Sequence, residues 1–441
     1  MVDRCFQSTA IFAIMAVMTA ATAAAGEYYV APNGDDGGKG TKSAPWRTIG
    51  KAAATLKPGD TVNIREGVYR ERVVPGASGE EGKPITYRAY KGEKPVIDGT
   101  GVDLTEWTGL IDIESRHHII VEGLTIRNGL RKFDVAGIKA EKCGDLVIRG
   151  NRTIDTASSG IMVWRSRNVV IDGNEVTGAC NDGSQECITV AITDGFEISN
   201  NNVHHNGPGN HGGEGIDAKD GSSNGKICGN HVHDNVRLGI YADSWDKHEF
   251  NIEIFNNVVH DCSVGLAVAA ENGGLLENVR IYNNLAYKNK HDGIVVAGWG
   301  EPVPHHPIKD VWIVNNTLYH NGLPNWGAGI MVENSDATGI VIRNNLLVGN
   351  ETCQISQPKK QAGVTIDHNL LDSYHAAEDE IKGNAPVEGK SLLRDPEKAD
   401  FHLMKGSAAA GAGSPDGAPP TDYDGHPRPK GGPVALGAFE P

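Results

Sequence analysis

The sequence has few aromatic residues, no long apolar run beyond its N-terminus, and fewer basic than acidic side chains. Aromatic residues make up 6% of 441 positions, and the formal net charge is -15. Past the N-terminus, no apolar run reaches the roughly 18 residues of a membrane-spanning helix. Nucleic-acid binding needs a basic face to meet the phosphates. We therefore expect neither nucleic acid nor a membrane as a partner. We also expect the protein to be a monomer.

Cysteine is also scarce, and its spacing contains no paired Cys-x-x-Cys pattern of the kind that holds structural zinc. Most of the cysteines are expected to be small buried residues, and Cys180 and Cys187 are the best candidates for a disulfide. Histidines crowd residues 201–233, but no His-Glu-x-x-His motif is present, which argues against bound zinc. They are His204, His205, His211, His231 and His233.

Residues 1–25 have the pattern of an export signal. A short polar start contains Arg4, an apolar stretch begins at Ile11, and Ala23 to Ala25 provide the small residues of a cleavage site. The sequence therefore predicts a secreted or periplasmic protein.

Glycine and asparagine are abundant, and asparagine is concentrated in one segment. The chain has 56 Gly and 33 Asn, and 29 of the Asn lie between Asn151 and Asn369. Short β-branched segments recur there with one Asn each, about every 27 residues. The recurring positions are Asn151, Asn174, Asn201, Asn230, Asn257, Asn284, Asn316, Asn345 and Asn369. A second element, typified by Gly-Ile-Asp-Ala at 215–218, follows each of them.

Such repeats predict an all-β parallel β-helix of about ten coils. Strands of three to five residues bury too little apolar surface alone, whereas stacked coils form a continuous core. Asn suits the bends because it tolerates the left-handed conformation, and stacked Asn side chains can form ladders. Residues 26–110 are predicted as the N-terminal cap and first coils, with a short helix near 47–57. Residues 111–375 are the repeats, and 376–441 form a Pro/Gly-rich cap or tail.

Strand alternation predicts which side chains point outward. Two consecutive coils place Asp217 and Lys219 beside Tyr241 and Asp243. This patch is either a candidate site or a solvated charged face with a Lys219–Asp243 surface salt bridge. The next two coils offer only Ala and Val.

The motifs YYVAPNG at 28–34 and PWRTIGKAAATLKPGDTVNIREGVY at 45–69, with the tail FHLMKGSAAAGAG, resemble secreted right-handed β-helix carbohydrate-active proteins. Polysaccharide lyase family nine, the pectate lyases, is nearest in layout. Residues 217–222 also resemble the Asp-Pro-His-Asp signature of mannuronan C-5 epimerases, with Lys219 in place of the histidine. The resemblance implies a right-handed β-helix that abstracts the C5 proton of a uronate sugar.

The family-nine resemblance further implies a calcium site, since carboxylates are the ligands that calcium prefers. Glu214 and Asp217 match two of the family's ligands, Glu186 fits a third from one coil earlier, and Asp220 lies nearby. Gly213 lacks the family's other carboxylate, and Tyr241 occupies the position of its lysine base. Calcium is therefore a possible cofactor, expected at these acidic residues.

The catalytic candidates are Lys219, Tyr241 and Asp243. Lys219 is either the base or the group that neutralises the uronate carboxylate, Tyr241 a base or an acid, and Asp243 a tuning group. The expected polysaccharide-binding residues are Lys139, Trp164, Trp245, Lys247, His248 and Trp299. The leading hypothesis is a polysaccharide lyase. A glycoside hydrolase, with Asp217 and either Asp243 or Glu214 as its carboxylate pair, stays open as an alternative. A C-5 epimerase and a non-catalytic glycan-binding solenoid also stay open.

Overall fold

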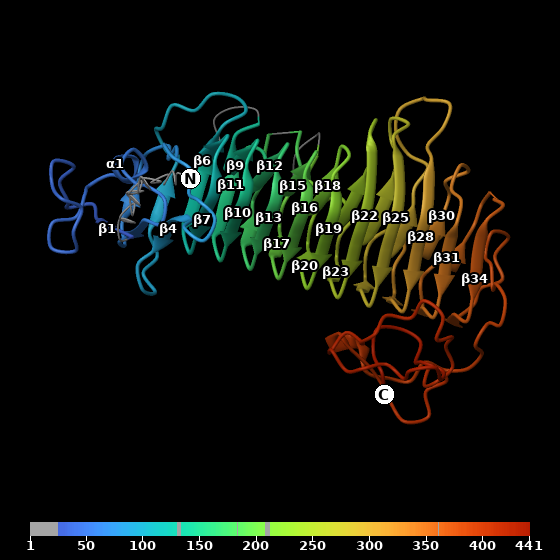
Figure 1. Ribbon diagram of the computed structural model, residues 1–441. Coiled ribbons are helices and arrows are strands. Elements are labelled where there is room, and N and C mark those ends of the chain that lie inside the picture. Colours follow the sequence, from blue (N-terminus) through green and yellow to red (C-terminus); the bar gives the residue numbers. More distant parts are fainter. Residues whose placement is uncertain (1–24, 130–133, 183, 208–211, 360) are drawn as a thin grey trace, which may run out of the picture.

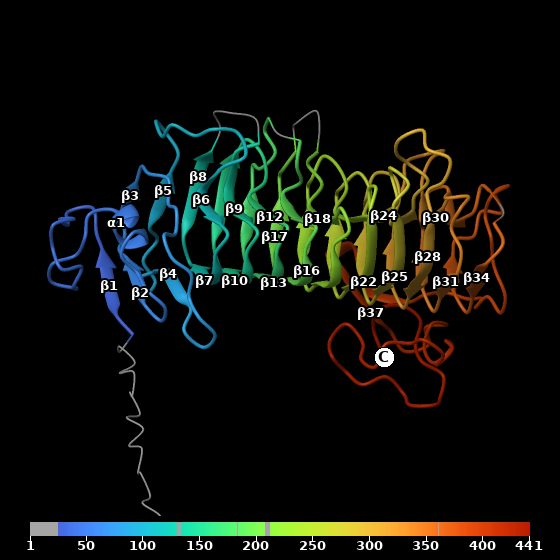
Figure 2. The same cartoon turned by 45° about the horizontal axis from the view of Figure 1, so that its top comes forward.

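The computed structural model describes residues 25–129, 134–182, 184–207, 212–359 and 361–441. The predicted export signal lies outside the described residues except for Ala25. Short strands stack along one axis into a rod, with the N-terminal residues at one end (Figures 1 and 2). Within the described ranges, no helix has the length and apolar character needed to cross a membrane.

Three parallel sheets run along the rod, and from β6 to β33 each coil contributes a strand to each sheet in turn. We call them sheets 1, 2 and 3. Sheet 1 has 13 strands in chain order: β1 (Glu27–Val30), β2 (Thr61–Ile64), β4 (Ile85–Ala89), β7 (His117–Glu122), β10 (Gly144–Arg149), β13 (Arg167–Asp172), β16 (Asp194–Ser199), β19 (Ser223–Cys228), β22 (His248–Phe255), β25 (Leu275–Tyr282), β28 (Ile308–Val314), β31 (Ile340–Arg343) and β34 (Val364–Asp367).

Sheet 2 carries the bends that follow sheet 1 and has 12 strands: β3 (Val68–Tyr69), β5 (Val96–Asp98), β8 (Thr125–Gly129), β11 (Arg152–Thr156), β14 (Glu175–Thr177), β17 (Asn202–His204), β20 (His231–His233), β23 (Val258–His260), β26 (Leu285–Tyr287), β29 (Thr317–Tyr319), β32 (Leu346–Val348) and β35 (Leu370–Asp372). Sheet 3 has 10 strands: β6 (Gly109–Glu114), β9 (Ala136–Glu141), β12 (Ile161–Trp164), β15 (Ile188–Ala191), β18 (Ile216–Lys219), β21 (Ile240–Asp243), β24 (Leu266–Ala269), β27 (Ile294–Val296), β30 (Ala328–Val332) and β33 (Cys353–Ser356). The predicted parallel β-helix is thus confirmed.

One apolar core fills the interior of the rod. Each coil directs Ile, Val or Leu side chains inward from all three sheets, and these residues are almost fully buried. A short helix, α1 (Ile49–Ala53), lies at the N-terminal end, where Thr48 caps it by accepting a hydrogen bond from the backbone N–H of Lys51. The helix covers the first coils with Ile49, Ala52 and Ala53.

The recurring asparagines form a buried ladder between sheets 1 and 2. The Asn257 side chain accepts from the backbone N–H and Nδ2 of Asn230 at 3.0 Å each, and donates to Ile227 O and to Asn284 Oδ1. The left-handed backbone was expected at these asparagines, but it occurs at the residue before each, such as Gly229 (φ 65°) and Asn256 (φ 54°). The ladder Asn therefore contributes through its buried side-chain amide, which bonds to Asn and backbone groups of the neighbouring coils.

The predicted disulfide is wrong. Cys180 and Cys187 are both buried and free, with their sulfur atoms 3.7 Å apart. Burial in apolar surroundings accounts for both side chains without a covalent bond.

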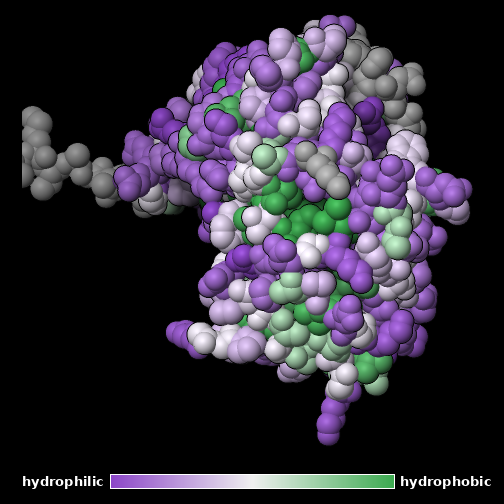
Figure 3. Space-filling model, turned by 90° about the vertical axis from the view of Figure 1, so that its right-hand side faces the viewer, coloured by the Kyte–Doolittle hydropathy of each residue, from purple (hydrophilic) through white to green (hydrophobic). Residues whose placement is uncertain are grey.

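The C-terminal residues fold back against the flank of the rod beside its last coils (Figure 1). A small antiparallel pair, β36 (Leu393–Asp395) and β37 (Asp400–Leu403), flanks a 3₁₀ turn, η1 (Pro396–Lys398). Phe401 and Phe439 pack on Leu285 and Tyr319 of sheet 2. Seen end-on, the last coil shows apolar side chains amid polar ones (Figure 3).

Candidate functional site

The candidate site lies on the outer face of sheet 3, where β18 and β21 are neighbours. The register pairs Asp217 with Tyr241 and Lys219 with Asp243, as the alternation predicted. These side chains are not part of a solvated face. Asp217 is 2% exposed and Tyr241 and Asp243 are 5% exposed.

A cleft of about 490 Å³ opens over this patch. Strand residues form its floor, and the segments that precede or follow strands of sheet 3 form its walls. Its lining residues are Trp164, Ser184, Gln185, Glu186, Gly212, Glu214, Asp217, Lys219, Asp220, Arg237, Tyr241, Asp243, Trp245 and Glu271. Six of these side chains are acidic and two are basic, so the cleft concentrates the acidic character of the chain.

The ammonium of Lys219 contacts Glu186 rather than Asp243. Its Nζ lies 2.8 Å from Glu186 Oε1, so the alternative of a surface Lys219–Asp243 salt bridge is wrong. Burial opposes the charged ammonium, but the neighbouring Glu186 carboxylate outweighs burial and raises the pKa of Lys219 above its ordinary value. Lys219 is therefore a cation at neutral pH, which suits charge neutralisation better than proton abstraction.

Asp243 is a lining carboxyl whose protonation changes near neutral pH. Burial, followed by the neighbouring Glu271 carboxylate, raises its pKa to about 7. Its Oδ1 accepts the backbone N–H groups of Trp245 at 2.9 Å and Glu271 at 3.2 Å. These bonds hold the carboxyl in one orientation, and a pKa close to the working pH suits a general acid or base.

Tyr241 and Glu271 form a second polar unit in the cleft. The Tyr241 hydroxyl donates to Glu271 Oε1 at 2.5 Å. Burial, with the charges of Asp243 and Glu271, raises the pKa of Tyr241 well above its ordinary value, so the phenol keeps its proton. Trp299 packs on the Tyr241 ring at a centroid distance of 6.5 Å. Tyr241 is thus suited to donate a proton rather than to accept one.

Asp217 lies between these units and is the most deeply buried of the acidic lining residues. Its Oδ1 has no hydrogen-bond partner among the described residues. Burial and the Glu186 carboxylate raise the pKa of Asp217 well above its ordinary value, which favours the neutral acid. An unpaired buried carboxyl oxygen costs free energy, and such costs are typical of functional sites.

The residues expected to bind calcium line the cleft, but cationic side chains already pair with two of them. Lys219 contacts Glu186, and Arg237 Nε lies 2.8 Å from Glu214 Oε1. Burial raises the pKa of Asp220, against the opposing charge of Lys219. The four expected ligands, Glu186, Glu214, Asp217 and Asp220, therefore fit a divalent cation poorly in this arrangement, and no catalytic step is derived from calcium.

The residues expected to bind polysaccharide divide into three groups. Trp164 and Trp245 line the cleft, and Trp299 supports it through Tyr241. Lys139 is buried in a neighbouring pocket of about 340 Å³, which it shares with Trp107 and Trp164. There its Nζ lies 3.1 Å from Glu141 Oε2.

Lys247 and His248 do not line the cleft. Lys247 is half exposed and pairs with Asp246, its chain neighbour. His248 begins β22 on sheet 1, where it faces Glu277 at 3.6 Å. Both residues follow Trp245, which lines the cleft, but the chain turns into sheet 1 here and places them outside the cleft lining.

Sequence reasoning missed Glu271 and Arg237. Glu271 follows β24, whose outward residues are only Ala, and the connection after that strand brings it over Tyr241. Arg237 precedes β21 by three residues and reaches back to Glu214 of the preceding coil. Strand alternation does not predict the positions of residues in such connections. Charged residues just before or after the strands of sheet 3 were the signal in the sequence that could have identified both.

A parallel β-helix with an acidic cleft on the outer face of one sheet defines a protein of the pectate-lyase-like architecture. The family model described as "Pel9A-like, right handed beta helix region" matches residues 28–374. The chain therefore belongs to this family, and the predicted right-handed β-helix is confirmed.

The relatives share the fold over most of their length. The uncharacterized protein YwoF of Bacillus subtilis (strain 168) is 30% identical over 396 residues, which cover 80% of this chain and 81% of YwoF. XylC, solved in complex with xylose, superposes with a TM-score of 0.60 at 15% identity, over 94% of this chain and 98% of XylC. Pectate lyase Pel9A superposes with a TM-score of 0.54 at 16% identity, over 94% and 96%. At these identities the two structures establish the fold alone.

Proposed function

We propose that the protein is an exported polysaccharide lyase that cleaves a uronate-containing glycan by β-elimination. Membership of the Pel9A-like family supports a carbohydrate-active role. The observation that carries the reaction type is the pairing of Lys219 with Asp243 across adjacent strands. This backbone register sets the partly buried cation of Lys219 on the strand next to a carboxyl whose pKa is about 7.

The proposed reaction divides the work among three side chains. The Lys219 ammonium faces the uronate carboxylate and lowers the cost of the negative charge that develops when C5 loses its proton. Asp243 in its carboxylate form accepts that proton as the base. The C4–O4 bond then breaks, the electrons of the C5–H bond form the C4=C5 double bond, and Tyr241 donates its proton to the departing oxygen.

The arrangement of the cleft accommodates this division. Tyr241 is kept protonated by burial and by two nearby carboxylates, so it is available as the acid. Arg237 adds a second cation at the rim, paired with Glu214. The substrate carboxylate would compete with Glu186 for Lys219, which supplies local attraction that the overall charge of -15 does not.

The test is an activity screen of the purified chain against pectate, alginate and glycosaminoglycans, with ultraviolet absorbance of the unsaturated product as the readout. The expected result is an unsaturated product from one of these polymers, reduced by about 10²-fold or more in Lys219→Met and Asp243→Asn. Lys247→Met and Asp246→Asn are the matched controls, because their charges lie outside the cleft lining. No unsaturated product from any polymer would reject the lyase.

A glycoside hydrolase is the second candidate, favoured by the six acidic side chains of the cleft. A hydrolase needs one protonated and one ionised carboxyl group about 5–10 Å apart. Asp243, with its pKa of about 7, would be the acid in that case. New reducing ends without any unsaturated product would favour the hydrolase over the lyase.

A further inference from the structure

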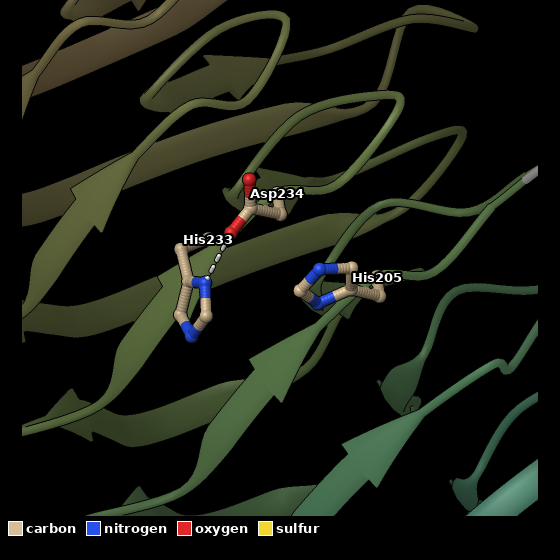
Figure 4. Close-up of side chains that lie close together, drawn as sticks. All are labelled: His205, His233 and Asp234. Carbon is tan, nitrogen blue, oxygen red and sulfur yellow. Dashed lines mark hydrogen bonds and ion pairs between the residues drawn. The ribbon is translucent and has the colours of Figure 1, made fainter.

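A cluster of imidazole and carboxylate groups lies on the flank of the rod, outside the cleft. It contains His205, which follows β17, and His233 and Asp234 at the end of β20. One potential ligand atom from each of the three lies within 4.8 Å of the other two. Figure 4 shows the His233 ring and the Asp234 carboxylate joined by a hydrogen bond, with the His205 ring beside them from the neighbouring coil. We propose that His205, His233 and Asp234 bind a divalent transition-metal ion such as Zn²⁺.

The backbone holds the three residues at fixed positions. The N–H of His205 donates to the carbonyl of Asp234 at 3.1 Å, so the two residues occupy the same bend of successive coils. Both adopt the left-handed conformation, with φ of 55° and 52°. The next residues, Asn206 and Asn235, continue a buried asparagine ladder with a contact of 3.2 Å. The ligand positions are therefore set by the core, and only side-chain rotations are needed to close on an ion.

The chemistry of the donor set selects the class of metal. Two imidazole nitrogens and one carboxylate oxygen suit Zn²⁺, which binds such groups at about 2.0–2.2 Å with tetrahedral geometry. Calcium instead takes six to eight oxygen ligands. His205 and Asp234 are exposed, so the fourth position is open to water. His204 stands next to the cluster, with its Nδ1 2.8 Å from Nδ1 of His205.

Neighbouring coils repeat parts of the cluster but not the whole. In the next coil, His260 pairs with Asp261 at 2.6 Å. Asp261 occupies the bend position that Asp234 has in the preceding coil and Lys288 in the following one. His320 occupies the bend position of His205 further along the rod, with the same backbone conformation (φ 50°). These residues provide matched comparisons, because each reproduces one element of the proposed site in the same local structure.

A bound ion would join two coils whose connections border the cleft. The segment after His205 leads to Glu214, and the segment after Asp234 leads to Arg237, and these two side chains form an ion pair in the cleft wall. The metal would stabilise this part of the rod without contacting the cleft. Binding is therefore expected to raise thermal stability, since an ion that binds only the folded state stabilises it.

The test uses residues 26–441, without a polyhistidine tag. This protein is titrated with Zn²⁺ near neutral pH, and binding is measured by calorimetry. The expected result is one ion per chain, with affinity reduced by roughly tenfold or more in His205→Asn and in His233→Ala. Asparagine tolerates the left-handed backbone, so His205→Asn removes the imidazole without strain. The matched controls are His320→Asn and Asp261→Asn, which are expected to retain the affinity.

Thermal unfolding gives the second readout. Zn²⁺ is expected to raise the midpoint for the natural chain and for His320→Asn, and to leave that of His205→Asn unchanged. Absence of a stoichiometric site, or equal affinity in the natural chain and His205→Asn, would overturn the proposal. Stoichiometric binding of Ca²⁺ at the same residues would also overturn the assignment of the metal class.

Discussion

At the scale of single residues, the structure changes the roles that side chains in the cleft can take. Lys219 was a candidate base, but its contact with Glu186 holds it as a cation. Tyr241 keeps its proton because burial disfavours the phenolate. Asp243, expected to tune its neighbours or to act as one carboxylate of a hydrolase, is a group whose protonation changes near neutral pH. The environment of each group, and not its type, decides which one accepts a proton.

The pH dependence of kcat/KM is expected to report Asp243, because this parameter follows the ionisations of the free enzyme. If Asp243 is the base of a lyase, its carboxylate is the active form, and kcat/KM rises with pH through about 7. If Asp243 is the acid of a hydrolase, kcat/KM falls through the same range. A profile that is flat between about pH 6 and 8 would rule out both roles.

Asp243→Asn is expected to stabilise the fold at alkaline pH while removing activity. The folded pKa of about 7 lies above the unfolded value, so the natural chain loses stability as pH rises between the two values. Asn keeps the acceptor for the Trp245 N–H and has no charge to bury. The midpoint of thermal unfolding should rise by about 2 °C at pH 8 and stay unchanged at pH 4. An equal shift at both pH values would contradict this account.

At the scale of elements, the coil that contains Asn251 and Asn257 belongs to two unlike asparagine columns. Asn257 belongs to the buried ladder and satisfies backbone groups of the preceding coil. Asn251, a few residues earlier, belongs to an exposed column that links Asn224 and Asn278. The repeat pattern in the sequence does not distinguish the two columns. Because one is buried and the other exposed, they are expected to contribute differently to the free energy of unfolding.

Asn257→Ala is expected to lower the free energy of unfolding by about 3 kcal/mol, because it leaves the Asn230 N–H and Ile227 carbonyl buried without partners. Asn251→Gly on the same coil is the control and should cost no more than about 0.5 kcal/mol, since glycine adopts the left-handed backbone of this position (φ 58°) and water replaces the lost bonds. Denaturant unfolding measures both. Similar losses in the two variants would show that the ladder has no special role.

At the scale of the whole molecule, the C-terminal segment is attached to the rod by buried apolar and polar contacts. The Arg428 guanidinium is 4% exposed and donates to Asn283 Oδ1 at 2.9 Å and to Gly437 O at 3.0 Å. Its Nη1 also pairs with Glu440 at 2.5 Å. The Arg428 side chain thus bonds both to other residues of the C-terminal segment and to Asn283, which directly follows β25.

Arg428→Ala is expected to release the tail while the β-helix stays folded. Removing one partner of a buried ion pair costs about 3–5 kcal/mol, because Glu440 is left without its cation. Limited proteolysis should cut residues beyond about 385 faster than in the natural chain, with an unchanged far-ultraviolet circular dichroism spectrum. Arg394→Ala, an exposed arginine of the same segment, is the control. Equal rates of cleavage in both variants would contradict the role of Arg428.

The parallel β-helix, the register and the outward pairs of β18 and β21 could all be predicted from the amino-acid sequence. These features follow from period-two alternation and a repeat of about 27 residues, which are local or regular properties of the chain. The partner of Lys219, the position of Glu271 over Tyr241 and the contact of His205 with Asp234 became apparent only in the folded molecule. Each depends on irregular connections or on bend geometry between coils. Burial and charge there arise from contacts between residues about 30 positions apart, which no strand pattern encodes.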